Sequence, residues 1–296
     1  MKTHYGGQAL IEGVLIRGRS GVFAAVRAPD GHVVTRELPL DAGKRKLIGK
    51  IPVVRGVVAL GDTVSLGTQM LMFSADIAAG GTGESVSPMG KRASLGAATV
   101  AAALFAVLPS VLAKQLGKGR RKAPAPPSGI RAHLTEGGVR IGVLLGYLTI
   151  VGRLKDVQRV FAYHGAEHKS ISALEAGAEL TPADVQQFDT AHPRCGTAFL
   201  LQSMLSSTLV YAAVGNRTPL GRIGTRVALI PVIAGLSYEV LQFNARHLDS
   251  KLVKLLNTPG MLLQRLTTRQ PSDDQVEVAL SALRGAMAMD ERSSQH

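Results

Sequence analysis

The order of apolar and polar residues divides the 296-residue chain into a β-rich start and a series of long apolar segments. Residues 1–50 contain three short runs rich in β-branched residues, separated by glycines and by a Pro-Asp-Gly turn at 29–31; the runs are 9–17, 22–27 and 33–38. Short alternating runs between turn residues are typical of adjacent strands. We therefore predict a small β-meander in this portion, with residues 6–8 forming the turn into the first strand.

Residues 51–92 differ in character from the strands before them. Between 51 and 79 the sequence is apolar and contains several glycines, with three charged residues, Arg55, Asp62 and Asp76. We interpret 51–92 as one or two helices that lie on a membrane surface or are partly embedded in it.

Four later segments are apolar enough to cross a membrane. Residues 93–113 hold 21 residues without a charge, about 31 Å of helix at 1.5 Å per residue, which matches the thickness of a bilayer core. Residues 197–215 are also uncharged, and 227–243 are interrupted only by Glu239. Residues 133–152 are a weaker span, because Arg140 and Arg153 would have to extend toward the headgroups. We expect about four transmembrane helices.

The remaining segments connect these helices. Residues 114–132 form a basic Pro/Gly-rich linker, and 153–196 hold a polar helix and a loop. Residues 244–296 form a tail with a helix at 273–288, because Ser272 and Gln275 have capping-box spacing. The positive-inside rule places the linker in the cytoplasm, whereas one crossing before it places it outside. A re-entrant hairpin, or a span at 57–73, would remove this conflict, and we expect both termini to be cytoplasmic.

Charge distribution favours a membrane protein over a nucleic-acid-binding one. The formal net charge is +13, but the cations flank long uncharged stretches and form no single basic stripe with aromatic residues between. We therefore expect the lipid bilayer, and other membrane proteins, as partners and no nucleic acid. The single cysteine, Cys195, excludes an intramolecular disulfide and a multi-cysteine zinc ribbon.

The densest group of reactive residues is the segment His-Gly-Ala-Glu-His at 164–168. On a helix, His164 and His168 share one face, with Glu167 beside them. Two imidazoles at this spacing hold a divalent metal in the H-x-x-E-H arrangement of inverzincin peptidases, where the glutamate takes a proton from water. The alternative is a buried pair of histidines with ordinary hydrogen bonds.

A second group is His192-Pro-Arg194-Cys195, in the loop before the span at 197–215. Imidazole and thiolate both suit zinc, so His192 and Cys195 are candidate ligands. Arg194 and the following helix N-terminus would lower the pKa of a thiol, so Cys195 could instead act as a nucleophile with a histidine base. A turn with a buried cysteine is the third interpretation.

Glu239, next to Tyr238, is a carboxylate inside an apolar span. Such a residue needs a partner in lipid and is often functional. It could return as a third metal ligand, or it could form an ion pair with Arg140 or Arg153 from a neighbouring helix.

Several stretches together resemble the YqhQ-like family of bacterial membrane proteins. They include GGQALIEGVLIRG at 6–18, IPVVRGVVALG at 51–61, RVFAYHGAEHKSI at 159–171, HPRCGTAFL at 192–200, PVIAGLSYEVLQ at 231–242 and PGMLLQRLTTRQPSDDQVEVA at 259–279. The resemblance implies a multi-pass protein of the bacterial cell membrane with a domain of unknown function, described as a metal-dependent enzyme. That metal would map onto His164, Glu167 and His168, with His192 and Cys195 as further candidates.

These observations predict a mainly α, polytopic membrane protein with a small N-terminal β-rich portion and a cytoplasmic C-terminal helix. We interpret it as a zinc-type metal-dependent hydrolase at the membrane face. Glu167 would be the general base, and His164 and His168 would bind metal with His192, Cys195 or Glu239. The competing interpretation is a non-catalytic membrane adaptor or regulator in which these residues only tie helices together. The sequence points to no substrate class.

Overall fold

The computed structural model describes residues 5–40, 51–83, 130–214 and 219–295. Within these ranges it contains four strands and eight helices, so the mainly helical class with a small N-terminal antiparallel sheet is confirmed. The span expected at 93–113 and most of the linker expected at 114–132 lie outside the described residues.

The four strands form an antiparallel meander in the order β1-β2-β3-β4: β1 (Gly6–Leu10), β2 (Gly13–Arg17), β3 (Gly21–Arg27) and β4 (Val33–Pro39). The expected single strand over 9–17 was wrong, because a tight turn at Ile11 and Glu12 splits it into β1 and β2. Glu12 has φ of 54°, the left-handed conformation that such a turn requires. The segment 6–8, expected as a turn, lies in β1.

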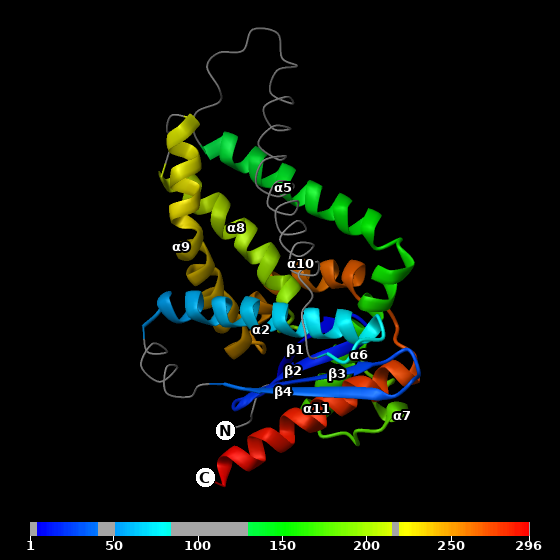
Figure 1. The fold of residues 1–296 in the computed structure, drawn as a ribbon. Helices are drawn as coiled ribbons and strands as arrows, with labels where there is room; N and C mark the ends of the chain where they lie inside the picture. The colour runs from blue at the N-terminus through cyan, green and yellow to red at the C-terminus, as the bar shows by residue number, and fades with distance from the viewer. Residues whose placement is uncertain (1–4, 41–50, 84–129, 215–218, 296) are drawn as a thin grey trace.

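A helical layer covers each face of the sheet. The alternation of side chains along β2 places Leu15 on the face of α2 (Val54–Ala78), where Met70 and Phe73 pack. Val14 and Ile16 point to the opposite face, which α6 (Lys155–Ala176) and α11 (Asp273–Ser294) cover. The sheet is therefore the centre of the core, with α2 on one side and α6 and α11 on the other (Figure 1).

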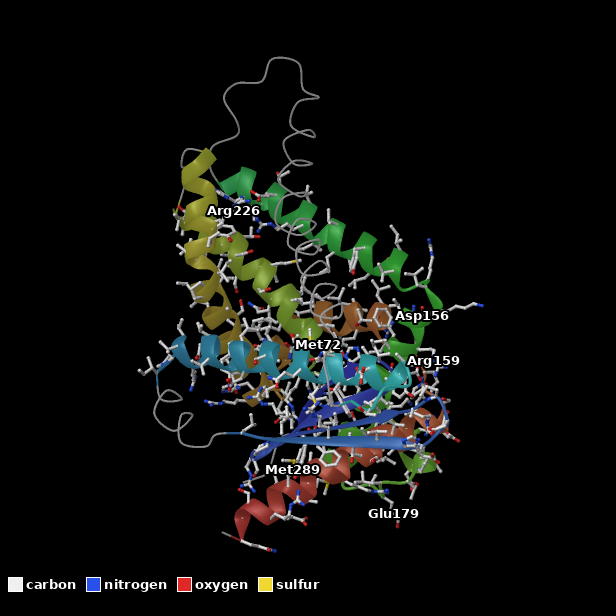
Figure 2. All side chains as sticks on the ribbon, viewed as in Figure 1. Met72, Asp156, Arg159, Glu179, Arg226 and Met289 are labelled. Atoms are coloured by element: carbon white, nitrogen blue, oxygen red, sulfur yellow. The ribbon has the colours of Figure 1, made fainter. Side chains whose placement is uncertain are left out.

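Salt bridges and close packing fasten the helices to the sheet, and two of the residues involved, Arg159 and Met289, are labelled in Figure 2. Arg159 of α6 donates from Nε to Glu12 in the β1–β2 turn at 2.6 Å. On α11, Met289 packs against Gly21, where a side chain on the strand would collide with the thioether. Asp290 accepts from the backbone N–H groups of Arg19 at 3.1 Å and Ser20 at 2.8 Å.

Three helices, α5 (Ile130–Val151), α8 (Gly196–Val214) and α9 (Pro219–Arg246), pack together on the other side of α2 from the sheet (Figure 1). Among the described residues, four helices are long and apolar enough to cross a membrane: α2, residues 133–151 of α5, α8, and residues 224–246 of α9. The last three correspond to the segments predicted at 133–152, 197–215 and 227–243. The fourth, α2, is the segment we expected at the membrane surface.

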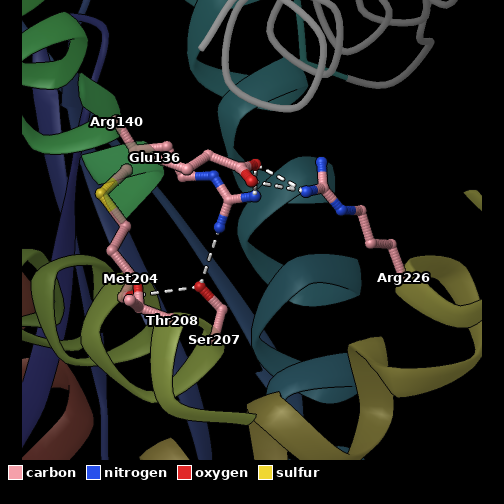
Figure 3. Close-up of polar contacts among 6 residues, drawn as sticks. All are labelled: Glu136, Arg140, Met204, Ser207, Thr208 and Arg226. Atoms are coloured by element: carbon pink, nitrogen blue, oxygen red, sulfur yellow. Dashed lines mark hydrogen bonds and ion pairs between the residues drawn. The ribbon is translucent and has the colours of Figure 1, made fainter. Parts of the chain in front are cut away.

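A polar cluster joins α5, α8 and α9 inside this apolar group (Figure 3). Glu136 accepts from Arg140 at 2.8 Å and from Arg226 at 2.6 Å, and Arg140 also donates to Ser207 at 3.2 Å. Both guanidinium groups lie over the Tyr211 ring, with their carbon atoms 5.4 and 5.3 Å from its centroid. Pairing of this kind is what allows charged side chains to sit among apolar helices.

The last part of the chain contains a helix that the sequence did not predict. Residues 244–296 were expected as a tail with one helix at 273–288, but α10 (Lys251–Thr267) precedes α11. Pro259 and Gly260 disfavour a helix on intrinsic grounds. Packing overrides this propensity, because Gly260 brings α10 close to Ala198 at the start of α8. The capping box of α11 is present, and Gln275 accepts from the Ser272 N–H at 3.1 Å.

Candidate metal centre

The histidine helix α6 lies between the sheet, α10 and the loop that leads into α8. Its pair His164 and His168 are one turn apart, with ring centroids at 4.3 Å. Gly165 lets the helix approach the chain after α10, because a Cβ there would collide with the carbonyl of Arg269. The helix ends at Gly177, whose φ of 72° is a left-handed C-cap.

Three side chains converge on one point: His164, His168 and Cys195. One potential ligand atom from each lies within 4.8 Å of the others, and His164 Nε2 is 3.2 Å from Cys195 Sγ. Cys195 is buried at the N-terminus of α8, where the thiol is also 3.1 Å from the Thr197 hydroxyl. Nitrogen and sulfur donors in this combination are the set that zinc prefers.

Backbone carbonyls fix the orientation of both imidazoles. His164 Nδ1 lies 2.8 Å from the carbonyl of Thr267, and His168 Nδ1 lies 2.6 Å from the carbonyl of Thr190. A carbonyl can only accept, so each Nδ1 carries the proton and donates it. Each Nε2 therefore keeps its lone pair, and in His164 this atom is the one that faces Cys195. This pattern of outer hydrogen bonds is typical of histidines that bind metals.

Burial favours the uncharged forms of His168 and Cys195. It lowers the pKa of His168 to about 3, with the neighbouring His164 adding to the effect. Burial also raises the pKa of the Cys195 thiol, which the hydrogen bonds to Thr197 only partly oppose. A bound cation would act in the opposite direction on a thiol, because coordination deprotonates it.

Glu167 lies beside His164, His168 and Cys195 but is not one of these three potential ligands. Its side chain is buried, with 4% of the residue exposed, and burial raises its pKa to about 8, against the opposing effects of His164 and of a hydrogen bond from the Gly7 backbone. Gly7 makes room for the carboxyl group, because a Cβ at that position would lie 3.0 Å from the Glu167 carboxyl carbon. Among the described residues, Glu167 Oε2 has no hydrogen-bond partner.

The loop that carries Thr190 and Cys195 is held from two directions. Lys169, buried on α6, donates to the carbonyl of Gln186 at 2.9 Å and to that of Phe188. From α10, Gln264 accepts from the His192 N–H at 2.8 Å and donates to the His192 carbonyl at 2.9 Å. The ligand positions are thus set by residues with no metal-binding chemistry of their own.

The His192 ring lies next to the centre but outside the three-donor group. Its Nδ1 is 3.3 Å from the Arg194 N–H, and its Nε2 is 3.4 Å from Glu175, which also pairs with the Arg194 guanidinium. The ring centroid is 5.8 Å from that of His168. Burial lowers the pKa of His192 to about 4. His192 and Arg194 therefore contact Glu175 and are not part of the His164, His168 and Cys195 group.

Glu239 links α9 to α2, whereas the Tyr238 hydroxyl bonds within α9. Glu239 accepts from the Arg55 Nε at 2.7 Å and from the Val53 N–H at 3.2 Å, so the partner is on α2. An ion pair with Arg140 or Arg153, the alternatives expected, is not what the structure shows. The Tyr238 hydroxyl accepts from Gln242 one turn further along α9 at 2.9 Å. Neither side chain is part of the His164, His168 and Cys195 group.

Sequence reasoning missed the residues that orient the ligands. Thr190 and Thr267 act through backbone carbonyls, which leave no trace in a residue pattern. Gln264 lies in a helix that was not predicted, and Gly7 was expected in a turn. Only Lys169 had a signal, because it directly follows His168 in the predicted histidine helix.

Comparisons with known proteins place the chain beside proteins whose function is unassigned. Residues 51–289 match the family described as "Protein of unknown function (DUF1385)". The "Uncharacterized protein YqhQ" of Bacillus subtilis (strain 168) is 33% identical over 301 residues, which cover 99% of this chain and 95% of the Bacillus protein. No solved structure matches.

Proposed function

The chain belongs to the DUF1385 family, and we propose that it is a membrane-resident metal-dependent hydrolase whose divalent ion is held by His164, His168 and Cys195. The family assignment supplies no activity, so the proposal depends on the site.

One observation carries the proposal: the hydrogen bonds at the two histidines. Both Nδ1 atoms donate to backbone carbonyls, which leaves both Nε2 atoms with a free lone pair, and that of His164 lies beside the Cys195 sulfur. Histidines that only fill a core need no such matched orientation. Around a tetrahedral zinc ion, nitrogen and sulfur ligands are separated by about 3.5 Å. The 3.2 Å between His164 Nε2 and Cys195 Sγ is close to that separation.

Glu167 supplies the second part of the proposal. Bound to these three residues, a zinc-type ion would supply Lewis acidity and leave a fourth position for water. The Glu167 carboxyl group, oriented by the Gly7 N–H, is near enough to both His164 and Cys195 for each to influence its pKa. Its Oε2, without a protein partner among the described residues, is the atom we assign to accept the proton of the attacking water, in the ionised form that a cation bound beside it would favour.

The exposed surface of the helices supports the membrane setting. α5, α8 and α9 expose large apolar side chains, among them Ile150, Leu209 and Val227. Exposed apolar surface of this extent is expected for lipid contact. Cys195 immediately precedes α8, and Thr267 ends α10, so the site lies where the apolar helices meet the sheet layer. We therefore place the reaction at the face of the bacterial cell membrane.

A second candidate is a cysteine nucleophile, which the 3.2 Å contact between His164 Nε2 and Cys195 Sγ also allows. In that mechanism the thiol gives its proton to His164 and the sulfur attacks an acyl carbon. Two features favour the metal over this dyad. Burial raises the pKa of the thiol, and the dyad has no use for His168.

The direct test is the metal content of protein purified in detergent or nanodiscs, measured by plasma mass spectrometry. We expect about one transition-metal ion per chain and its loss in His164→Ala/His168→Ala. His32→Ala, at an exposed turn before β4, is the matched control and should keep the ion. A parent without metal, or a double variant that keeps it, would contradict the proposal. Glu175→Ala tests whether the neighbouring His192 group contributes, and it should retain the ion.

Alkylation separates the metal centre from the cysteine dyad. Cys195 is the only cysteine, so N-ethylmaleimide labels one site. A metal ligand should resist labelling until a chelator removes the ion and should then react. A cysteine nucleophile should react at the same rate with and without the chelator, and that result would select the dyad.

A further inference from the structure

α10 has three distinct faces. Its buried face, formed by Val253, Gly260, Leu263, Gln264 and Thr267, packs toward α8 and the candidate metal centre. Most of the rest of the helix is exposed, although it is rich in leucine. This combination makes α10 amphipathic in an unusual way, because an apolar face remains after the packing against the protein is complete.

The exposed apolar face is a row of leucines. Leu252, Leu255, Leu256 and Leu262 follow helical spacing, and Leu255 is 68% exposed. Side chains of this size are normally covered when they form a contiguous row. Phe243, near the end of α9, is also exposed and extends the apolar surface toward the start of α10.

The third face is basic. Lys251, Lys254 and Arg265 are exposed on α10. From 246 to 269 the chain has five cations and one acid, Asp249. A helix with a leucine row next to a lysine and arginine row is typical of segments that lie in the interface of an anionic bilayer.

The position of α10 agrees with this chemistry. α10 crosses the N-terminal end of α8, where Gly260 approaches Ala198, so it lies at the end of a candidate span and not along it. In Figure 1, α10 runs across the view just above α2, beside the lower end of α8. A helix in a membrane surface lies in this way relative to the helices that cross the membrane.

We propose that α10 lies in the headgroup layer of an anionic leaflet, with its leucine row in the acyl region and its basic row on lipid phosphates. The inference rests on the membrane setting of the proposed function but not on the metal. It deepens that function, because Gln264 and Thr267 on the buried face hold His192 and His164. The lipid surface and the candidate centre therefore share one rigid helix, and the substrate would meet the centre at headgroup depth.

The chain has no tryptophan, so a single introduced tryptophan reports its own surroundings. We would place Leu255→Trp in nanodiscs with brominated acyl chains and compare it with two matched variants. Leu209→Trp lies on an exposed face of α8 and reports membrane residence; Val33→Trp lies on exposed β4 and reports water. We expect Leu255→Trp and Leu209→Trp to lose most of their fluorescence, and Val33→Trp to respond to aqueous iodide instead.

The outcomes separate the two proposals. Loss of lipid quenching at Leu209→Trp would contradict the membrane setting itself. Quenching at Leu209→Trp without quenching at Leu255→Trp would overturn only the inference for α10. A Leu255→Trp residue shielded from both lipid and iodide would also overturn it, because a second copy or another segment would then cover the leucine row.

Lipid charge tests the basic row. With Leu255→Trp as reporter, phosphatidylglycerol should increase quenching relative to phosphatidylcholine alone. Lys251→Glu/Lys254→Glu should abolish this difference, whereas Lys155→Glu, at the start of α6, should leave it unchanged. Equal quenching in both lipids would contradict an anionic partner.

Discussion

Gln264 offers a test of how α10 supports the candidate metal centre. The side chain is 0% exposed, and its amide makes hydrogen bonds to both backbone groups of His192, at 2.8 and 2.9 Å. Gln264→Leu keeps the approximate volume and removes both bonds. The N–H and C=O of His192 would then be buried without partners, in the loop that carries Cys195.

The expected cost follows from these two groups. Each buried backbone group left unsatisfied costs about 1–3 kcal/mol, so with partial relaxation of the loop we expect about 2–4 kcal/mol of lost unfolding free energy. At about 2–4 °C per kcal/mol, the Tm should fall by about 4–16 °C. Residues that orient metal ligands typically change metal affinity by about 10–100-fold, and we expect weakening in that range.

Two assays check the prediction. Circular dichroism follows thermal unfolding, and competition with a chromogenic chelator gives the metal Kd. Gln187→Leu, at an exposed position of the same loop, is the matched control and should resemble the parent in both. If Gln264→Leu also matches the parent in Tm and Kd, the loop does not depend on α10 and the reasoning is wrong.

Three further variants test other contacts. Glu167→Gln should retain metal and fold but lose any hydrolytic activity, by about 10²–10⁴-fold for a general base; metal loss would instead make Glu167 a ligand. Gly7→Ala should lower the Tm, because its Cβ would collide with the Leu15 carbonyl oxygen and lie 3.0 Å from the Glu167 carboxyl group, at an overpacking cost of about 1–3 kcal/mol; an unchanged Tm would contradict this close packing around Gly7. Burial raises the pKa of Asp290, but the N–H groups of Arg19 and Ser20 hold it below its usual value. The stabilisation by its carboxylate should be present above about pH 4 and disappear in stronger acid. In chemical unfolding, Asp290→Asn should therefore lower the free energy of unfolding by about 1–2 kcal/mol at neutral pH and by less near pH 3. An equal loss at both pH values would refute this role.

The elements that the sequence predicted well are those with a strong local pattern. Alternation along 22–27 and 33–38 defined β3 and β4, and the capping box at Ser272 defined the start of α11. The β1–β2 turn was missed because its two residues, Ile11 and Glu12, are not of the types that favour turns. α10 was missed because Pro259 and Gly260 hide a helix that only packing against α8 stabilises.

The candidate site was only partly predictable from the sequence. His164 and His168 are four residues apart, and any α-helix places two such residues on the same face. That Cys195 joins them, while Glu239 pairs with Arg55, depends on how distant segments pack. A single sequence carries no signal for such contacts between residues far apart in the chain.

The most direct test of the central claim is X-ray absorption at the zinc edge of the purified full chain in nanodiscs. The account predicts imidazole nitrogen scatterers at about 2.0–2.1 Å and one sulfur at about 2.3 Å. Cys195→Ser should remove the sulfur contribution and leave the two imidazoles. A spectrum with oxygen ligands only, or one that Cys195→Ser does not change, would contradict a metal centre built from His164, His168 and Cys195.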